Sequence, residues 1–202
     1  MQKDYIMRIV EQLVQAILAI MRRRKNGEYK EAREQARTAV RYLLRMDIDL
    51  LLLFDNEHVL NRFKDFANRL DTERCVLGAD LLQELALIEE AEQQTAIAKR
   101  LKVLCLYLYM TALPKEHQFQ KPEYLEKVAD LIKELKDQPL SEEVRVSVRP
   151  YEEFVATEQK STNSDAAFVP KNAYFRTRLF NANFNLTSQQ KEVMHKRIST
   201  KC

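Results

Sequence analysis

A glycine followed by three regularly spaced alanines constrains this chain most, because the pattern requires a sharp turn and then a closely packed helix. Gly27 precedes Tyr29 by two residues, and the alanines are Ala32, Ala36 and Ala39. Glycine readily takes the left-handed backbone conformation that often ends a helix. Alanines spaced by four and three residues lie on one side of a helix, where small side chains let a second backbone approach. The stretch predicts a helical hairpin that turns at Gly27.

The amino-acid composition favours an all-α fold. Two glycines and five prolines in 202 residues leave little material for the turns of a sheet protein. The commonest residues are strong helix formers such as leucine, alanine, glutamate and lysine. The three cysteines, Cys75, Cys105 and Cys202, form an odd and widely spaced set. We therefore expect reduced thiols and a cytoplasmic protein rather than a disulfide framework.

Apolar residues recur at helical spacing along most of the chain. We expect helices at about 3–24, 28–46, 56–69, 72–92, 94–113, 122–137 and 141–153. Short connections between them favour antiparallel neighbours. The segment 47–54 is predicted to be a short helical turn whose apolar side chains fill the core. Leu104 and Leu108 belong to a segment that is apolar on nearly every side, which is typical of a central, buried helix.

The first expected helix, 3–24, carries a broad apolar stripe and ends in the basic cluster 22–25. Its apolar run is too short for a membrane span, and the basic cluster follows the run, which is the wrong order for a signal peptide. Two interpretations stay open. The helix packs in the core with a basic last turn that suits the helix dipole, or it lies on a membrane surface.

The Gly27 turn, with its aromatic residue and its alanines, resembles the second helix of a tetratricopeptide repeat. Residues 93–108 give a weaker match to the same pattern. There Ala98 and Cys105 stand at alanine positions, and Gln93 takes the place of the glycine. The resemblance implies paired helices that stack on one another.

A wider resemblance covers residues 1–154. The opening segment 4–12, the hairpin at 27–29, the turn at 47–51 and the closing segment 151–153 together resemble an uncharacterised family of small bacterial all-helical proteins. The resemblance implies a tetratricopeptide-like, right-handed array of about seven helices in antiparallel hairpins. It transfers no catalytic residue and no cofactor.

The last part of the chain, residues 155–202, differs in charge and composition. It holds eight lysines or arginines against three acidic residues, a net charge of +5, whereas the remaining 25 basic and 27 acidic residues give a net charge of −2. Residues 155–172 have the composition of a linker, and Thr187 opens a capping-box sequence that predicts a short helix at about 187–199. We expect a helical domain over 1–154 and a basic, partly disordered tail.

Aromatic and basic residues alternate within residues 171–201 of this tail. The residues concerned are Tyr174, Phe175, Arg176, Arg178, Phe180 and Phe184. Such alternation is typical of surfaces that bind single-stranded nucleic acid. It is equally typical of a strap whose aromatic side chains dock in a groove, which would keep them out of water.

The densest group of metal-ligand residue types is Asp47, Asp49, Asp55, Glu57 and His58. A metal site would need a further ligand from a second helix. In the alternative interpretation Asp49 or Asp55 caps a helix and Glu57 adds charge to its first turn. Because the three histidines are scattered and no glycine-rich phosphate loop or paired-cysteine motif is present, we expect no enzyme, no cofactor and no metal.

The function predicted from these patterns is a non-catalytic helical scaffold or adaptor that binds a protein or peptide partner. The helix-pair pattern and the lack of recognisable chemistry support it. The alternative is a nucleic-acid-binding protein that acts through the basic aromatic tail, residues 171–201.

Overall fold

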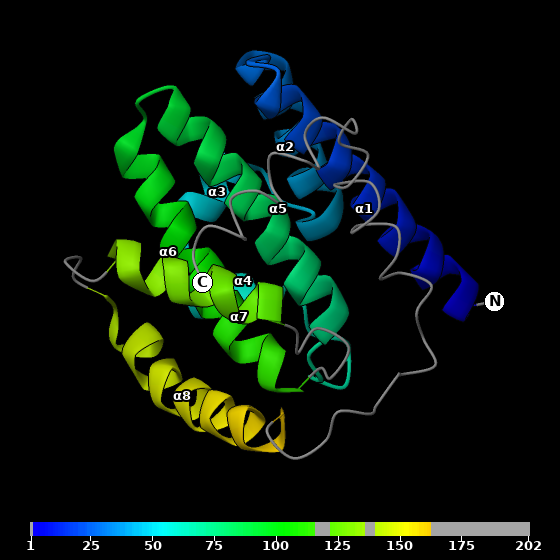
Figure 1. Ribbon diagram of the computed structural model, residues 1–202. Helices are drawn as coiled ribbons and strands as arrows, with labels where there is room; N and C mark the ends of the chain where they lie inside the picture. Colours follow the sequence, from blue (N-terminus) through cyan, green and yellow to red (C-terminus); the bar gives the residue numbers. More distant parts are fainter. Residues whose placement is uncertain (1, 116–121, 136–139, 163–202) are drawn as a thin grey trace, which may run out of the picture. The chain divides into compact units, whose positions relative to one another are not determined.

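The structure, a computed structural model, describes residues 2–115, 122–135 and 140–162 (Figure 1). Its elements are α1 Gln2–Lys25, α2 Tyr29–Leu44, α3 Ile48–Leu53, α4 Asn56–Asn61, α5 Thr72–Ala91, α6 Thr95–Ala112, the 3-10 turn η1 Leu113–Lys115, α7 Pro122–Leu135 and α8 Glu142–Thr162. In these ranges there is no strand, and the one isolated β-bridge joins Lys64 to Leu70. The predicted all-α fold is confirmed for this part of the chain.

Two helical hairpins build the core. α1 pairs with α2, and α5 pairs with α6 along most of their length. α5 also contacts both α1 and α2, while α6 contacts α7 and α8. Leu104 and Leu108 on α6 are fully buried, as predicted, and α1 buries Leu13, Ile17 and Ile20. The stripe on the first helix therefore packs in the core.

The turn between α1 and α2 has the geometry predicted for Gly27. Gly27 adopts φ +81°, in the left-handed region. Its N–H donates to the Arg24 carbonyl at 3.0 Å, and the Glu28 N–H donates to the Arg23 carbonyl at 3.0 Å. These two bonds make a Schellman motif, which satisfies carbonyls that the end of a helix leaves unpaired.

The turn between α5 and α6 repeats this motif without a glycine. Gln93 adopts φ +64° and its N–H donates to the Glu90 carbonyl at 3.0 Å, while the Gln94 N–H donates to the Glu89 carbonyl at 2.8 Å. The N-cap residue just before the second helix, Glu28 or Gln94, has φ −81° and ψ 59° in both hairpins. The weak sequence match at residues 93–108 thus corresponds to a repeated turn. Gln93 takes a left-handed conformation that is uncommon for a residue with a side chain, so the turn keeps its geometry although the glycine is missing.

The small-residue stripe is also repeated, with one change. Ala32 and Ala36 are fully buried and Ala39 nearly so. Counted from the turn, the equivalent residues on α6 are Ala98, Lys102 and Cys105, and all three are buried. Tyr29 is half-buried. The stripe therefore lets both second helices pack closely, and α6 carries a buried lysine where α2 has an alanine.

Charged residues fix the position of α5 among its neighbours. Asp80, Glu84 and Glu89 on this helix are at most 8% exposed. They pair with Lys127 of α7, Arg24 of α1 and Arg33 of α2, respectively. Because a buried carboxylate without its partner is costly, each pair favours one register between two helices. Lys102 likewise joins α6 to Glu90 of α5 and Glu134 of α7.

The helix predicted over 56–69 is wrong beyond Asn61. α4 ends there, and residues 62–70 form a loop. The Asp65 carboxylate accepts hydrogen bonds from the backbone N–H groups of Ala67 and Arg69, at 2.8 and 2.9 Å, and Asn68 adopts φ +59°. Aspartate and asparagine compete in this way with helical hydrogen bonds.

Two further expectations need correction. The short helical turn near 47–54 exists as α3, but its apolar residues do not all fill the core. Ile48 and Leu51 are buried, whereas Leu50 is 48% exposed and Leu53 is 82% exposed. The last helix was expected to end at residue 153, but α8 continues to Thr162 and includes the first part of the expected linker. The alanine and polar residues there contain no glycine or proline to stop a helix.

Candidate functional site: an arginine-lined hollow and the loop beside it

The residues that the sequence predicted as an interaction site lie outside the described ranges. They are Tyr174, Phe175, Arg176, Arg178, Phe180 and Phe184. The helix-pair residues Gly27, Ala32, Ala36 and Ala39 are described, and they form the turn and the helix contact.

The acidic group around Asp55 is not brought together as a metal site. Asp55 caps α4, because its carboxylate accepts the His58 backbone N–H at 2.7 Å. The His58 ring Nδ1 lies 2.7 Å from the same carboxylate. These contacts, the backbone hydrogen bond first, lower the pKa of the exposed Asp55. In the described residues no three His, Cys, Asp or Glu side chains are grouped to hold an ion. Of the two caps considered, Asp55 has this role and Asp49 does not.

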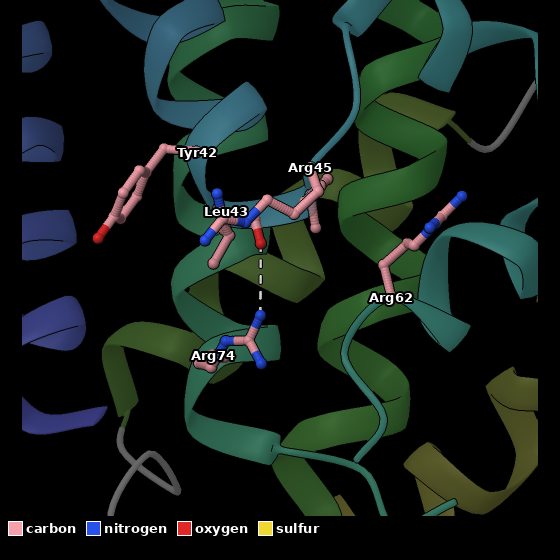
Figure 2. A pocket seen from close by; sticks show the side chains of 6 residues that line it. Tyr42, Leu43, Arg45, Arg62 and Arg74 are labelled. Atoms are coloured by element: carbon pink, nitrogen blue, oxygen red, sulfur yellow. Dashed lines mark hydrogen bonds between the residues drawn. The ribbon is translucent and has the colours of Figure 1, made fainter. Parts of the chain in front are cut away.

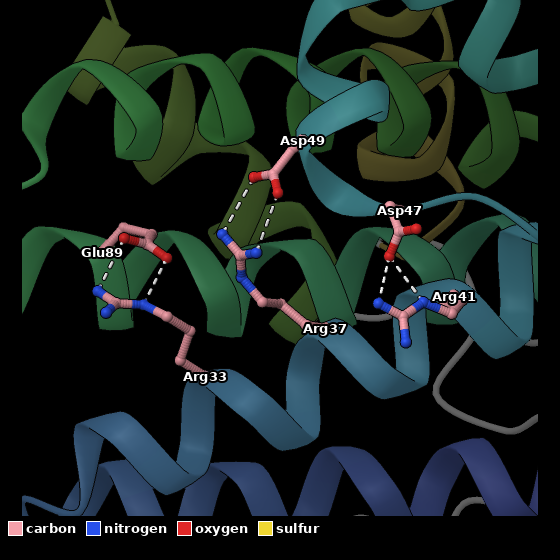
Figure 3. Close-up of polar contacts among 6 residues, drawn as sticks. All are labelled: Arg33, Arg37, Arg41, Asp47, Asp49 and Glu89. Carbon is pink, nitrogen blue, oxygen red and sulfur yellow. Dashed lines mark hydrogen bonds and ion pairs between the residues drawn. The ribbon is translucent and has the colours of Figure 1, made fainter.

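Asp47 and Asp49 instead pair with a row of arginines on α2, shown in Figure 3. The row is spaced by four residues, so its members lie on one face of the helix. Arg33 binds Glu89 through two hydrogen bonds of 2.8 and 2.9 Å. Arg37 binds Asp49 through two of 3.1 Å, and Arg41 donates to Asp47 at 2.6 Å. The row clamps α2 to α5 and to the segment that contains α3.

Both described cysteines are buried and unpaired. The Cys75 thiol lies 3.8 Å from the Leu108 carbonyl, and the Cys105 thiol lies 3.4 Å from the Ala79 carbonyl. Burial raises the pKa of both thiols. A protonated, inaccessible thiol is a packing group and does not act as a nucleophile.

A buried polar cluster around Asp80 joins α5, α6 and α7. The Asp80 carboxylate accepts hydrogen bonds from the hydroxyls of Tyr109 at 2.7 Å and Tyr124 at 3.0 Å, and it pairs with Lys127. Burial, followed by the charge of Asp80, raises the pKa of both tyrosines. The hydroxyls therefore stay protonated as donors. With every partner in place and little access to solvent, the cluster holds α7 on the hairpin.

A surface hollow of about 190 Å³ lies at the end of α2 (Figure 2). Its lining comes from three segments that the fold brings together: the end of α2 and its cap, the residue after α4, and the first turn of α5. The lining residues are Tyr42, Leu43, Leu44, Arg45, Arg62 and Arg74. Three of the six are arginines, so the hollow is strongly basic.

The three arginines of the hollow differ in their partners. Arg74 donates to the Leu43 carbonyl at 3.3 Å and pairs with Asp71 at 3.6 Å. The Arg45 guanidinium lies 5.6 Å from the centre of the Tyr42 ring, a cation–π contact. Within the described part of the chain, no carboxylate forms an ion pair with Arg45 or Arg62. Arg74 thus belongs to the scaffold, while the other two charges are available at the surface.

The loop 62–70 anchors one aromatic side chain and exposes another. Phe63 is fully buried, and its ring lies against Gly78 of α5. Phe66 is fully exposed at the tip of the loop. The hydrogen bonds to Asp65, its contact with the Arg69 guanidinium at 2.8 Å and the bridge between Lys64 and Leu70 fix the backbone on both sides of the tip. The loop therefore holds an exposed phenylalanine on an organised turn.

Reasoning from the sequence missed this surface. Its residues are far apart in the chain and are brought together by packing, which no local pattern reveals. One signal was present: an aspartate and an asparagine three residues apart, Asp65 and Asn68, are typical turn residues. They stand within a stretch whose apolar spacing suggested a continuous helix.

Comparisons with known proteins found no match among family models, curated proteins or solved structures. None of the helices in the described ranges combines the length and the apolar character needed to cross a membrane.

Proposed function

We propose that this protein is a non-catalytic helical scaffold or adaptor that binds a protein or peptide partner. Its helices would form a tetratricopeptide-like, right-handed array. Two hairpins with the same Schellman turn, and the contacts of α5 with both helices of the first hairpin, support this arrangement. The unpaired buried thiols of Cys75 and Cys105 support a reducing cytoplasm as its compartment.

The observation that carries the proposal is the exposed Phe66 on its organised loop. An exposed phenylalanine contributes nothing to the core, and its ring offers a large apolar surface to a partner. Because hydrogen bonds already hold the loop, binding would cost little additional ordering of its backbone. The basic hollow, which is lined by Arg62 of the same loop, supplies arginines, which are frequent in the energetic centres of protein interfaces.

The test is affinity capture from the cell of origin with the full chain as bait, followed by reconstitution from purified components. Phe66→Ala should weaken binding of the captured protein about tenfold or more, since it removes a central aromatic contact. Val146→Ala is the matched control, because Val146 is 62% exposed on α8 and lies outside the surface described above. Equal binding by the Phe66 variant and the wild type, or no protein bound in a defined ratio, would contradict the proposal.

The separation of charge along the chain favours a second candidate function, nucleic-acid binding by residues 171–201. Eight basic and three acidic residues after position 154 give the local net charge of +5, and aromatic residues alternate with the bases. Such a tail would bind single strands through phosphate contacts and stacking. Removal of residues 163–202 should then abolish retention on single-stranded nucleic acid. Retention that survives the truncation, or that does not fall with added salt, would exclude this function.

A further inference from the structure

We propose that the arginine-lined hollow binds an acidic peptide segment of a partner protein. This inference rests on the proposed scaffold function and names the chemistry of the partner. Arg45 follows Arg33, Arg37 and Arg41 at the same four-residue spacing in the sequence, but it is the C-cap after α2, with a left-handed φ of 54°. The three earlier members each bind a carboxylate of this chain, as Figure 3 shows. Among the described residues Arg45 has no carboxylate partner, so its charge is available to a ligand.

The geometry of the hollow favours an extended ligand over a small ion. Figure 2 shows that the guanidinium groups of the hollow point in different directions. The Arg74 guanidinium is turned to the Leu43 carbonyl, and the Arg62 guanidinium extends away from Arg74. A single phosphate or sulfate would not bridge charges that diverge in this way. A peptide with several carboxylates would reach Arg45 and Arg62 separately, each through charge-assisted hydrogen bonds.

Phe66 gives the site an apolar component. It lies four residues after Arg62 on the same loop, and that loop is fixed to the core through the buried Phe63 ring. A ligand that also contacts the exposed Phe66 ring would need an apolar side chain at that point. The surface therefore fits a segment in which acidic residues flank an apolar one.

Charge complementarity decides between the possible occupants. The chain's own tail carries a net charge of +5, so the basic hollow would repel it. Apart from the tail the protein has a net charge of −2, so only the local charge of the hollow favours an anion at this surface. A short acidic segment needs only the local positive charge of the hollow. It is the occupant that the charges favour.

The experiment measures fluorescence anisotropy of a labelled glutamate-rich peptide that contains one leucine, titrated with the full-length protein. A peptide with glutamine in place of glutamate and a labelled single-stranded oligonucleotide are compared. The test variant is Arg45→Gln/Arg62→Gln, and Arg45→Lys/Arg62→Lys keeps the charge. The control Arg22→Gln/Lys30→Gln removes two exposed positive charges near the opposite end of α2, about 20 Å away along the helix axis.

We expect the acidic peptide to bind and the glutamine peptide not to bind. The Arg45→Gln/Arg62→Gln variant should weaken binding about tenfold or more, the lysine variant should lose less, and the control should bind like the wild type. Equal weakening by test and control variants would show a nonspecific charge effect and overturn the inference. Oligonucleotide binding that depends on Arg45 and Arg62, peptide binding that does not, or occupation of the hollow by a second copy of the chain would overturn it as well.

Failure of this inference is distinguishable from failure of the proposed function. A captured partner whose affinity depends on Phe66 but not on Arg45 or Arg62 would leave the scaffold function standing and remove the acidic-segment proposal. Unfolding of a variant is excluded by comparing its circular dichroism and melting temperature with those of the wild type.

Discussion

The contact between Gly78 and Phe63 provides the sharpest test of how the loop 62–70 is held. A Cβ atom added at Gly78 would lie 2.4 Å from the Phe63 Cζ, 2.6 Å from its Cε1 and 3.4 Å from a Leu43 methyl group. The first two distances are too short for carbon atoms in contact. Because Phe63 is fully buried, its ring cannot turn freely out of the way.

Gly78→Ala should therefore destabilise the protein, although alanine usually stabilises a helix. The change gains about 1 kcal/mol of helix propensity. Overpacking costs about 1 to 3 kcal/mol, and loss of the Phe63 ring from its site would cost about 3 to 5 kcal/mol. The net loss in the free energy of unfolding, measured by urea denaturation, should be up to about 2 kcal/mol if the ring is only strained and about 2 to 4 kcal/mol if it is displaced.

A double-mutant cycle with Phe63→Leu isolates the clash. The smaller side chain leaves room for the new methyl group, so Gly78→Ala should be neutral or stabilising in that background. The coupling energy between the two sites should then exceed about 1 kcal/mol. Stabilisation by Gly78→Ala in the wild-type background, as at an open helix position, would refute the packing described for this loop.

Three further predictions concern the helical domain. Gly27→Ala should lower the free energy of unfolding by about 1 kcal/mol, because alanine is strained at φ +81°. Gln93→Gly should leave the stability unchanged or raise it, because glycine adopts the left-handed conformation of residue 93 without strain. Opposite results in chemical denaturation would contradict the repeated turn. Leu104→Ala and Leu108→Ala should each lower the free energy of unfolding, measured by chemical denaturation, by about 2 to 5 kcal/mol. Losses below about 0.5 kcal/mol would contradict the burial of these two side chains. Asp55→Ala should lower the free energy of unfolding at neutral pH, where the wild-type carboxylate is charged. The difference in stability between variant and wild type should shrink as the pH falls through the lowered pKa of the native Asp55, because the carboxylate stabilises the cap only in its charged form. A difference that grows in acid would contradict the cap.

The helices that depend on local signals were predictable from the sequence. Gly27 marks the first turn, and the helices expected at 72–92 and 94–113 match α5 and α6 to within one residue at each end. The weak match at residues 93–108 corresponds to a turn of the same geometry, although a glutamine at position 93 does not by itself predict a left-handed turn. A left-handed glutamine is held by the helices on either side, so its conformation follows from packing rather than from its own preference.

The surface around the hollow was not predictable in the same way. Arg45, Arg62 and Arg74 come together through the buried Phe63 ring and the course of the loop, and each has an ordinary sequence context. The loop itself was hidden because Phe63 and the residues near it continue a helical apolar spacing. The turn at Asp65 overrides that spacing, since its carboxylate binds two backbone N–H groups that a helix would use.

Hydrogen exchange of the full-length protein, with and without the captured partner, tests the central claim most directly. If the protein is a scaffold that uses the surface described above, exchange should slow in residues 42–45 and 62–70 when the partner is bound. The turn at residues 26–28 should exchange at an unchanged rate and serves as the internal control. Slower exchange confined to residues 163–202, or no change in the helical domain, would contradict the account.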